Sequence, residues 1–220
     1  MSKSILLIGE SGSGKTTSMR TLDPKTTFYI DCDGKGLSWK GWRTQYNAKN
    51  KNYWNPIKGE PKETTVSDQI MAVMLKISQG QPDIKTIVID TLNTLMLDRE
   101  MRDPTKSFQK WSDIASDGYA VCMLANRLRD DLTVIIVGHA ETITEDTGRV
   151  YTRMKTNGRK LEKIVLESLF TTVLIATIKD GEYVFITREE NTTAKAPLEA
   201  FSTPTVPNDI SQVLETLKDY

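Results

Sequence analysis

The sequence has few of the features that mark secreted, zinc-binding or membrane proteins. Its only two cysteines, Cys32 and Cys122, lie far apart in apolar surroundings, so neither a disulfide framework nor a zinc site follows. The apolar run before the first glycine-rich loop, residues 5–8, is too short for a signal sequence or a membrane span. These absences predict a soluble cytoplasmic protein of a reducing compartment that has no membrane partner.

An excess of charge of either sign is also absent. The 220 residues include 29 basic and 29 acidic side chains, which give a formal net charge of zero. Overall charge therefore cannot attract nucleic acid, and any surface that binds it must come from local segregation of charge. The length fits one large α/β domain over residues 1–220 better than two domains.

Short apolar runs alternate with segments of helical period. The runs are typical of strands buried on both faces, which form parallel sheets. They occupy residues 4–8, 27–31, 85–90 and 133–138. Helices are expected from Lys15 to just before Pro24 and over residues 65–80, 108–130 and 208–218.

Two further runs, 168–178 and 182–188, are joined by Asp180-Gly181, which predicts an antiparallel hairpin. Residues 139–157 are polar and are expected to form a loop, and residues 190–220 are expected to form a C-terminal tail. The whole pattern predicts a doubly wound α/β fold with a mostly parallel sheet and an antiparallel hairpin at one edge.

The most specific motif follows the first predicted strand and matches G-x-x-x-x-G-K-[ST] in full. Its residues are Gly9, Glu10, Ser11, Gly12, Ser13, Gly14, Lys15 and Thr16, with Thr17 directly after them. Glycines let consecutive N–H groups turn toward phosphate oxygens, and the next helix adds positive charge at its N-terminus. In such loops the lysine reaches the β- and γ-phosphates and the hydroxyl coordinates Mg²⁺. We therefore predict that these residues bind ATP and Mg²⁺.

Carboxylates at the ends of two other strands are candidates for the chemistry. Asp90 ends a buried strand and is expected to hold Mg²⁺ together with Thr16. Because Thr91 and not a glutamate follows it, the base that activates water must lie elsewhere or be absent. Asp33 is our candidate for that base, since it lies further beyond its strand than Asp31; the alternative is that both aspartates only form a turn.

His139 directly follows the strand over 133–138, again at the edge where ligands bind in open α/β sheets. A role in sensing the γ-phosphate is one interpretation, and a structural hydrogen bond is the other. Residues 34–62 combine basic and aromatic side chains without a helical period and are expected to form an irregular insertion. The lysines and aromatics there either bind single-stranded nucleic acid by stacking on bases, or the aromatics form a small core over the sheet.

Together these pieces resemble the RecA-like ATPase core, and within it the phage-encoded AAA-domain nucleotide-binding proteins, some of which are single-strand annealing recombinases. The similar segments are GESGSGKT at 9–16, FYIDCDG at 28–34, TIVIDTLNTL at 86–95, VIIVGHAE at 134–141, TNGRKLEKIVLESLFTTVLI at 156–175 and TREENTTAKAPLEAF at 187–201. A recombinase-type N-terminal polymerisation segment has no expected counterpart, because the first predicted strand begins at residue 4.

The resemblance implies a role for each matching position. Asp33 would polarise the attacking water, Asp90-Thr91 is the family's ending of the metal-binding strand, and His139 holds the γ-phosphate-sensing position. The segment 140–157 would be the DNA-binding loop; its basic residues are Arg149, Arg153 and Lys155. Two more basic residues would reach the phosphates of a neighbouring subunit in a homo-oligomer: Arg188 and Lys195.

Three functions remain open at this point. The favoured one is a DNA-stimulated ATPase that acts on single-stranded DNA in phage recombination or replication, in the host cytoplasm and together with partner proteins of those processes. The second is a small-molecule P-loop kinase, in which Arg149, Arg153 and Arg159 would imitate a lid. The third is a nucleotide-gated accessory or assembly protein with weak turnover.

Overall fold

The computed structural model describes residues 2–58, 64–102, 108–157 and 165–220. Its centre is a sheet of nine strands, of which eight follow the order β3-β2-β4-β5-β1-β7-β8-β9, and β6 pairs with β5. The strands are β1 (Lys3–Gly9), β2 (Thr27–Asp31), β3 (Tyr53–Trp54), β4 (Thr86–Asp90), β5 (Thr133–Thr144), β6 (Val150–Met154), β7 (Thr172–Lys179), β8 (Glu182–Ile186) and β9 (Thr205–Pro207). Along this spatial order, the neighbouring strands from β3 through β7 pair in parallel. The pairs β7–β8 and β8–β9 are antiparallel.

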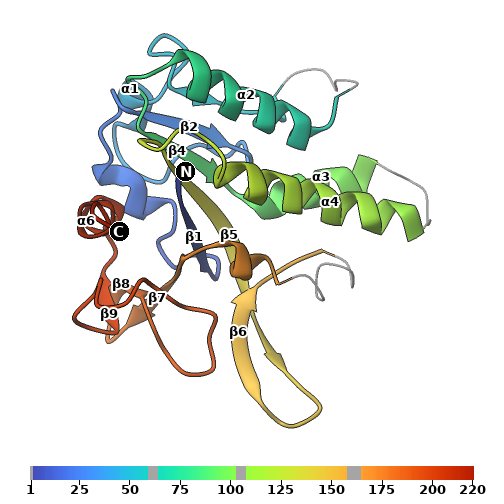
Figure 1. Cartoon of the computed structure of the whole chain (residues 1–220), viewed down its shortest axis with the longest axis vertical. Coiled ribbons are helices and arrows are strands. Elements are labelled where there is room, and N and C mark those ends of the chain that lie inside the picture. The colour runs from blue at the N-terminus through green and yellow to red at the C-terminus, as the bar shows by residue number, and fades with distance from the viewer. Residues whose placement is uncertain (1, 59–63, 103–107, 158–164) are drawn as a thin grey trace.

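Helices cover both faces of this sheet, as Figure 1 shows. One face carries α2 (Val66–Gly80), α3 (Leu92–Arg102) and α4 (Phe108–Ala125), and the other carries the 3-10 helix η1 (Thr17–Thr21) and α6 (Ile210–Thr216). The short elements α1 (Trp42–Gln45) and η2 (Leu166–Leu169) complete the set of described helices. The mostly parallel α/β sheet with its antiparallel edge is confirmed, and it is the arrangement of a RecA-like P-loop NTPase.

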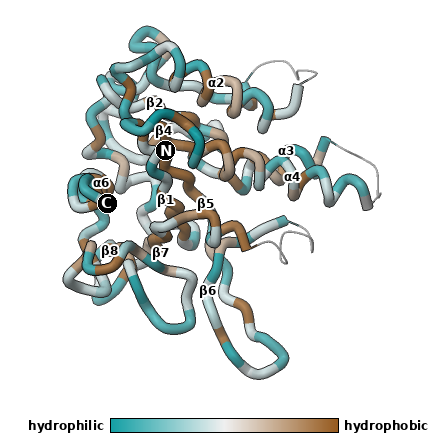
Figure 2. The backbone as a smooth tube through the Cα atoms, in the orientation of Figure 1, coloured by the Kyte–Doolittle hydropathy of each residue, from teal (hydrophilic) through white to brown (hydrophobic). Residues whose placement is uncertain are grey.

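Two hydrophobic cores result from the alternation of side chains along each buried strand. In β1, Leu6 and Ile8 pack with α2, α3 and α4, whereas Ile5 and Leu7 pack with η1 and α6. In Figure 2 the hydrophobic colour follows the central strands. A strand that is apolar on both faces can only be buried between two layers, which is why these runs lie at the centre of the sheet.

Several local expectations were wrong. The helix expected to start at Lys15 is only the five-residue η1, and α3 was not predicted at all. The expected loop over 139–157 is instead a two-stranded arm, because β5 continues to Thr144 and pairs with β6. Thr142 and Thr152 face each other in this pairing and their hydroxyls lie 3.0 Å apart. A pair of antiparallel strands can be polar when both of its faces are exposed to solvent. The polarity of the segment therefore did not indicate a loop.

The expected hairpin is confirmed as β7 and β8, with Asp180-Gly181 at its turn. The insertion at 34–62 is less irregular than expected, since α1 and β3 lie within it and β3 adds a parallel strand beside β2. Its last four residues, 59–62, lie outside the described residues.

The aromatic side chains of this insertion pack against one another and against the core, and all but Tyr46 are half-buried. Tyr46 is buried, and its ring lies edge-on to Tyr29 of β2 at 5.6 Å and to Trp39 at 6.0 Å. Trp42 packs against Tyr53 with their ring centres 5.4 Å apart. Burial of this kind favours the packing interpretation over stacking on bases.

No helix in the described parts of the chain is both long and apolar enough to cross a lipid bilayer.

Candidate functional site

The carboxyl ends of four strands bring the predicted site residues to one edge of the sheet. β5 lies between β1 and β4, and residue pairing fixes the register: Gly9 is opposite His139, and Asp31 is opposite Asp90. Segments that are far apart in the sequence therefore meet around one cavity of about 650 Å³. This edge is where ligands bind in open α/β sheets.

The loop after β1 has the backbone geometry that phosphate binding requires. Gly12 and Gly14 have φ angles of 83° and 88°, which favour glycine. A Cβ atom on Gly9 would lie 2.5 Å from the carbonyl oxygen of Ala176. Within the described chain, the main-chain N–H groups of Gly12 and Gly14 have no main-chain acceptor, and neither do the next two, at Lys15 and Thr16. Such free donors are suited to phosphate oxygens.

Lys15 is folded back onto this loop. Its ammonium donates to the carbonyl oxygens of Gly9 at 2.8 Å and Glu10 at 2.7 Å, and the side chain is buried. Burial lowers the pKa of Lys15 to about 8, while the nearby Asp90 carboxylate opposes that shift. The ammonium therefore stays mainly protonated at neutral pH and can exchange its carbonyl partners for phosphate oxygens.

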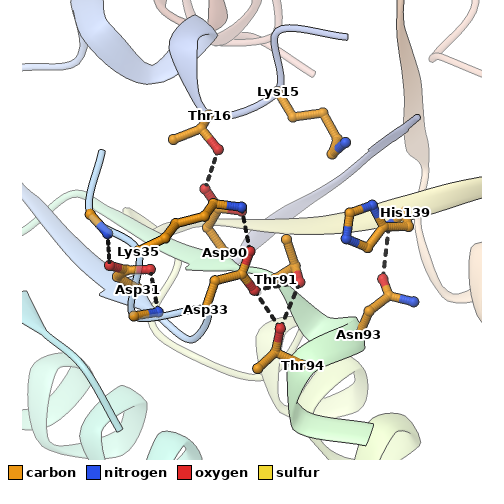
Figure 3. A network of polar contacts seen from close by, with 12 residues as sticks. Lys15, Thr16, Asp31, Asp33, Lys35, Asp90, Thr91, Asn93, Thr94 and His139 are labelled. Atoms are coloured by element: carbon orange, nitrogen blue, oxygen red, sulfur yellow. Dashed lines mark hydrogen bonds and ion pairs between the residues drawn. The ribbon is translucent and has the colours of Figure 1, made fainter. Parts of the chain in front are cut away.

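Asp90 and Thr16 lie together, as the metal-site prediction requires (Figure 3). The Thr16 hydroxyl donates to Oδ2 of Asp90 at 2.8 Å, and the buried Tyr29 hydroxyl donates to the same oxygen at 2.7 Å. The other oxygen, Oδ1, is buried and has no hydrogen-bond partner among the described residues. Burial raises the pKa of Asp90, and the two hydroxyl donors partly offset this.

This arrangement fits Mg²⁺. A buried carboxylate oxygen without a partner is costly in an apolar setting, and a cation coordinated directly or through water would satisfy it. Carboxylate and hydroxyl oxygens are ligands that Mg²⁺ prefers beside phosphates. Asp90 and Thr16 are thus the residues that would hold the metal, and the Tyr29 hydroxyl orients the carboxylate by its bond to Oδ2. The tyrosine was not identified from the sequence, where it is simply one residue of an apolar strand.

Asp33 lies next to this pair, beyond the end of β2. Its Oδ1 accepts from the hydroxyls of Thr91, at 3.0 Å, and Thr94, and its Oδ2 makes an ion pair with Lys35. Partial burial acts to raise the pKa of Asp33, but the bonds from Lys35 and the two threonines outweigh it, so the pKa is lowered. The carboxylate is therefore ionised at neutral pH, as an acceptor for a water proton must be.

Asp31 has a different part in the structure. Its oxygens accept from the backbone N–H groups of Gly34 at 3.0 Å and Gly36 at 2.8 Å, and from the Tyr53 hydroxyl at 2.6 Å. These bonds fix the loop that carries Asp33. Asp31 thus holds the turn, whereas Asp33 lies beside the metal-binding pair, and its role as the base stays a prediction.

His139 lines the same cavity as Lys15 and Asp90. Burial lowers the pKa of His139, and the Lys15 charge adds to this, so the imidazole is neutral at physiological pH. Its main chain is held by Asn93 of α3, whose Oδ1 accepts from the His139 N–H at 2.7 Å. Asn93 also donates to the Lys155 carbonyl oxygen at 2.8 Å. It links the site to the arm, a role that nothing in its sequence position indicates.

The remaining predicted residues lie away from the cavity. On the arm, Arg149 and Lys155 are exposed, whereas Arg153 pairs with Glu141 at 3.0 Å. Arg188 donates to the carbonyl oxygens of residues 201 and 202, and Lys195 lines a separate cavity at the opposite edge of the sheet. Their intersubunit role stays a prediction.

Two comparisons with known proteins bear on the family. The family model described as "AAA domain" matches residues 1–198, which include every residue of the site described above. A search of the curated proteins finds no match. The matched segment contains the glycine-rich loop, the Thr16–Asp90 pair and the sheet order that brings them together. The chain therefore belongs to the AAA domain family of P-loop ATPases.

Proposed function

We propose that this protein is a Mg²⁺-dependent ATPase whose turnover responds to single-stranded DNA. The observation that supports the ATPase activity is the hydrogen bond from the Thr16 hydroxyl to Oδ2 of Asp90 at 2.8 Å, beside a buried Oδ1 that has no partner in the described parts of the chain. The free N–H groups of the glycine-rich loop and the Lys15 ammonium supply the phosphate contacts. ATP is proposed over GTP because the sequence has no guanine-reading N/T-K-x-D stretch.

The proposed reaction is hydrolysis of the terminal phosphate. A water oxygen forms a bond to the γ-phosphorus, the bond from that phosphorus to the β,γ-bridging oxygen breaks, and ADP and phosphate leave. Asp33 accepts the proton that the water loses, and Lys15 balances charge on the departing oxygen. Mg²⁺, when bound, neutralises charge on the phosphate oxygens. His139, neutral and at the end of the cavity, would sense the γ-phosphate.

The DNA-binding half of the proposal rests on the continuity of β5. This strand passes His139 in the cavity and runs on without interruption into the arm, which projects from the body of the protein in Figure 1. The arm's tip is coloured hydrophilic in Figure 2. Its exposed Arg149 lies 5.3 Å from the centre of the Tyr151 ring, and Lys155 is exposed at its base. Cations beside an aromatic ring suit a single strand, in which phosphates and unstacked bases are both available.

Phosphate release measured with and without single-stranded DNA tests this proposal. We expect DNA to stimulate the wild type, and the double variant Arg149→Ala/Lys155→Ala to keep its basal rate but lose the stimulation. The variant should also reduce the slope of log affinity against log salt by about 1.4, because two phosphate contacts to a single strand are removed.

The control Lys49→Ala/Lys76→Ala removes the same charge away from the arm and should behave as wild type. Absence of DNA binding at low salt, together with an unstimulated rate, would contradict the DNA role. The remaining alternatives would then be a nucleotide-gated accessory protein with weak turnover or a small-molecule kinase. The lid arginine of the kinase hypothesis, Arg159, lies outside the described residues.

A further inference from the structure

Lys35 is a charged side chain of the phosphate cavity that has no role in the function proposed above. Lys35 lines this cavity together with Lys15, Thr16, Asp90 and His139. Its ammonium forms the ion pair with Oδ2 of Asp33 that Figure 3 shows. In the sequence it is one of several lysines in the insertion, where a lysine exposed to solvent is the ordinary expectation.

The loop around Lys35 is fixed at two points. The Asp31 carboxylate accepts from the N–H groups of Gly34 and Gly36, one on each side of Lys35. Both glycines have positive φ angles, 68° and 81°, which other residues rarely adopt. Further along, the Ser38 hydroxyl lies 2.8 Å from the Thr17 hydroxyl, which joins this loop to the phosphate-binding loop. The backbone thus presents Lys35 to the cavity in a defined position.

The side chain itself is free to move within that position. The Lys35 side chain is 56% exposed, whereas Lys15 is buried. Besides burial, the charge of Lys35 contributes to the lowered pKa of both Lys15 and His139, which places its ammonium within electrostatic range of the phosphate site. A flexible stem on a fixed loop can move a charge between two nearby partners at little cost.

We propose that Lys35 is a catalytic cation supplied by the same chain, which exchanges Asp33 for the γ-phosphate when a nucleoside triphosphate binds. This inference rests on the proposed ATPase function. The exchange serves both groups, since Oδ1 of Asp33 keeps its two threonine donors while Oδ2 becomes free to accept from the attacking water. The ammonium then lies where negative charge grows as the γ-phosphoryl group transfers, and there a cation stabilises the transition state.

The test separates the terminal phosphate from the rest of the nucleotide. For Lys35→Ala we expect kcat to fall by about 100-fold, the size of the loss when one charge-stabilising donor is removed. By calorimetry with Mg²⁺, its Kd for ADP should stay within about twofold of wild type, because ADP lacks the γ-phosphate that Lys35 contacts. Its Kd for a γ-thiophosphate analogue of ATP should rise about tenfold, which one lost charged contact explains. Lys35→Arg should recover most of the rate, and Lys40→Ala, an exposed lysine of the same loop, should match wild type.

Two results would overturn the inference. A higher kcat in Lys35→Ala would mean that the lysine only restrains Asp33. An equal loss of affinity for ADP and for the analogue would mean that it merely supports the loop. If the wild type itself bound neither nucleotide, the ATPase function would fail and this inference with it, a result that the wild-type titration alone reveals.

Discussion

Replacing Lys15 with alanine is expected to abolish ATP hydrolysis, with a fall in kcat of at least about 1,000-fold. Lys15 is the one buried lysine described in the chain, and its ammonium lies on the loop whose N–H groups face the cavity. Its loss removes the cation that contacts the departing β,γ-bridging oxygen in the proposed reaction, a contact that no γ-phosphate cation replaces. ATP affinity should fall as well, since the interaction is also made in the ground state.

The measurement is steady-state phosphate release, with nucleotide affinity measured by calorimetry. Lys25→Ala, which removes an exposed lysine, is the matched control and should keep wild-type activity. Because Lys15 also donates to two carbonyl oxygens of the loop, the melting temperature of the variant must be measured to show that it is folded. A folded Lys15→Ala protein that hydrolyses ATP at the wild-type rate would show that the nucleotide site is elsewhere.

Asp33→Asn should give the second large effect, a fall in kcat of roughly 100- to 10,000-fold, the range for loss of a general base. An amide keeps the shape and can still accept from Thr91 and Thr94, but it cannot take a proton from water. Nucleotide Kd should change little, so the effect separates chemistry from binding. Asp83→Asn, on the exposed turn before β4, serves as the control. Full activity in Asp33→Asn would show that another group activates the water.

The central strands and the phosphate-binding loop could be predicted because each depends on local sequence. An apolar run such as ILLI can bury its side chains on both faces only when it lies between two layers of helices. Gly12 and Gly14 allow the positive φ angles that the loop adopts. The metal-binding role of Asp90 was predicted from its place at the end of such a run. The meeting of Asp90 with Thr16 then needed only the rule that the carboxyl ends of parallel strands share an edge.

The parts that could not be predicted depend on contacts between distant segments. Tyr29 reads as one more apolar strand residue until β4 places Asp90 beside its hydroxyl. Asn93 becomes a link between site and arm only because β5 and Lys155, the residue after β6, lie against α3. The arm itself was mistaken for a loop, since polar strands exposed to solvent lack the apolar alternation by which strands are recognised.

The central claim is that ATP binds against the glycine-rich loop with its metal held by Thr16 and Asp90. Titration of ATP into the protein with and without Mg²⁺, for wild type and for Asp90→Asn, tests it most directly. Mg²⁺ should tighten ATP binding to the wild type by roughly 10- to 100-fold, and most of this gain should disappear in Asp90→Asn, as expected for loss of a group that holds the metal. An equal effect of Mg²⁺ on both proteins, or no binding of ATP to the wild type with Mg²⁺ present, would contradict the claim.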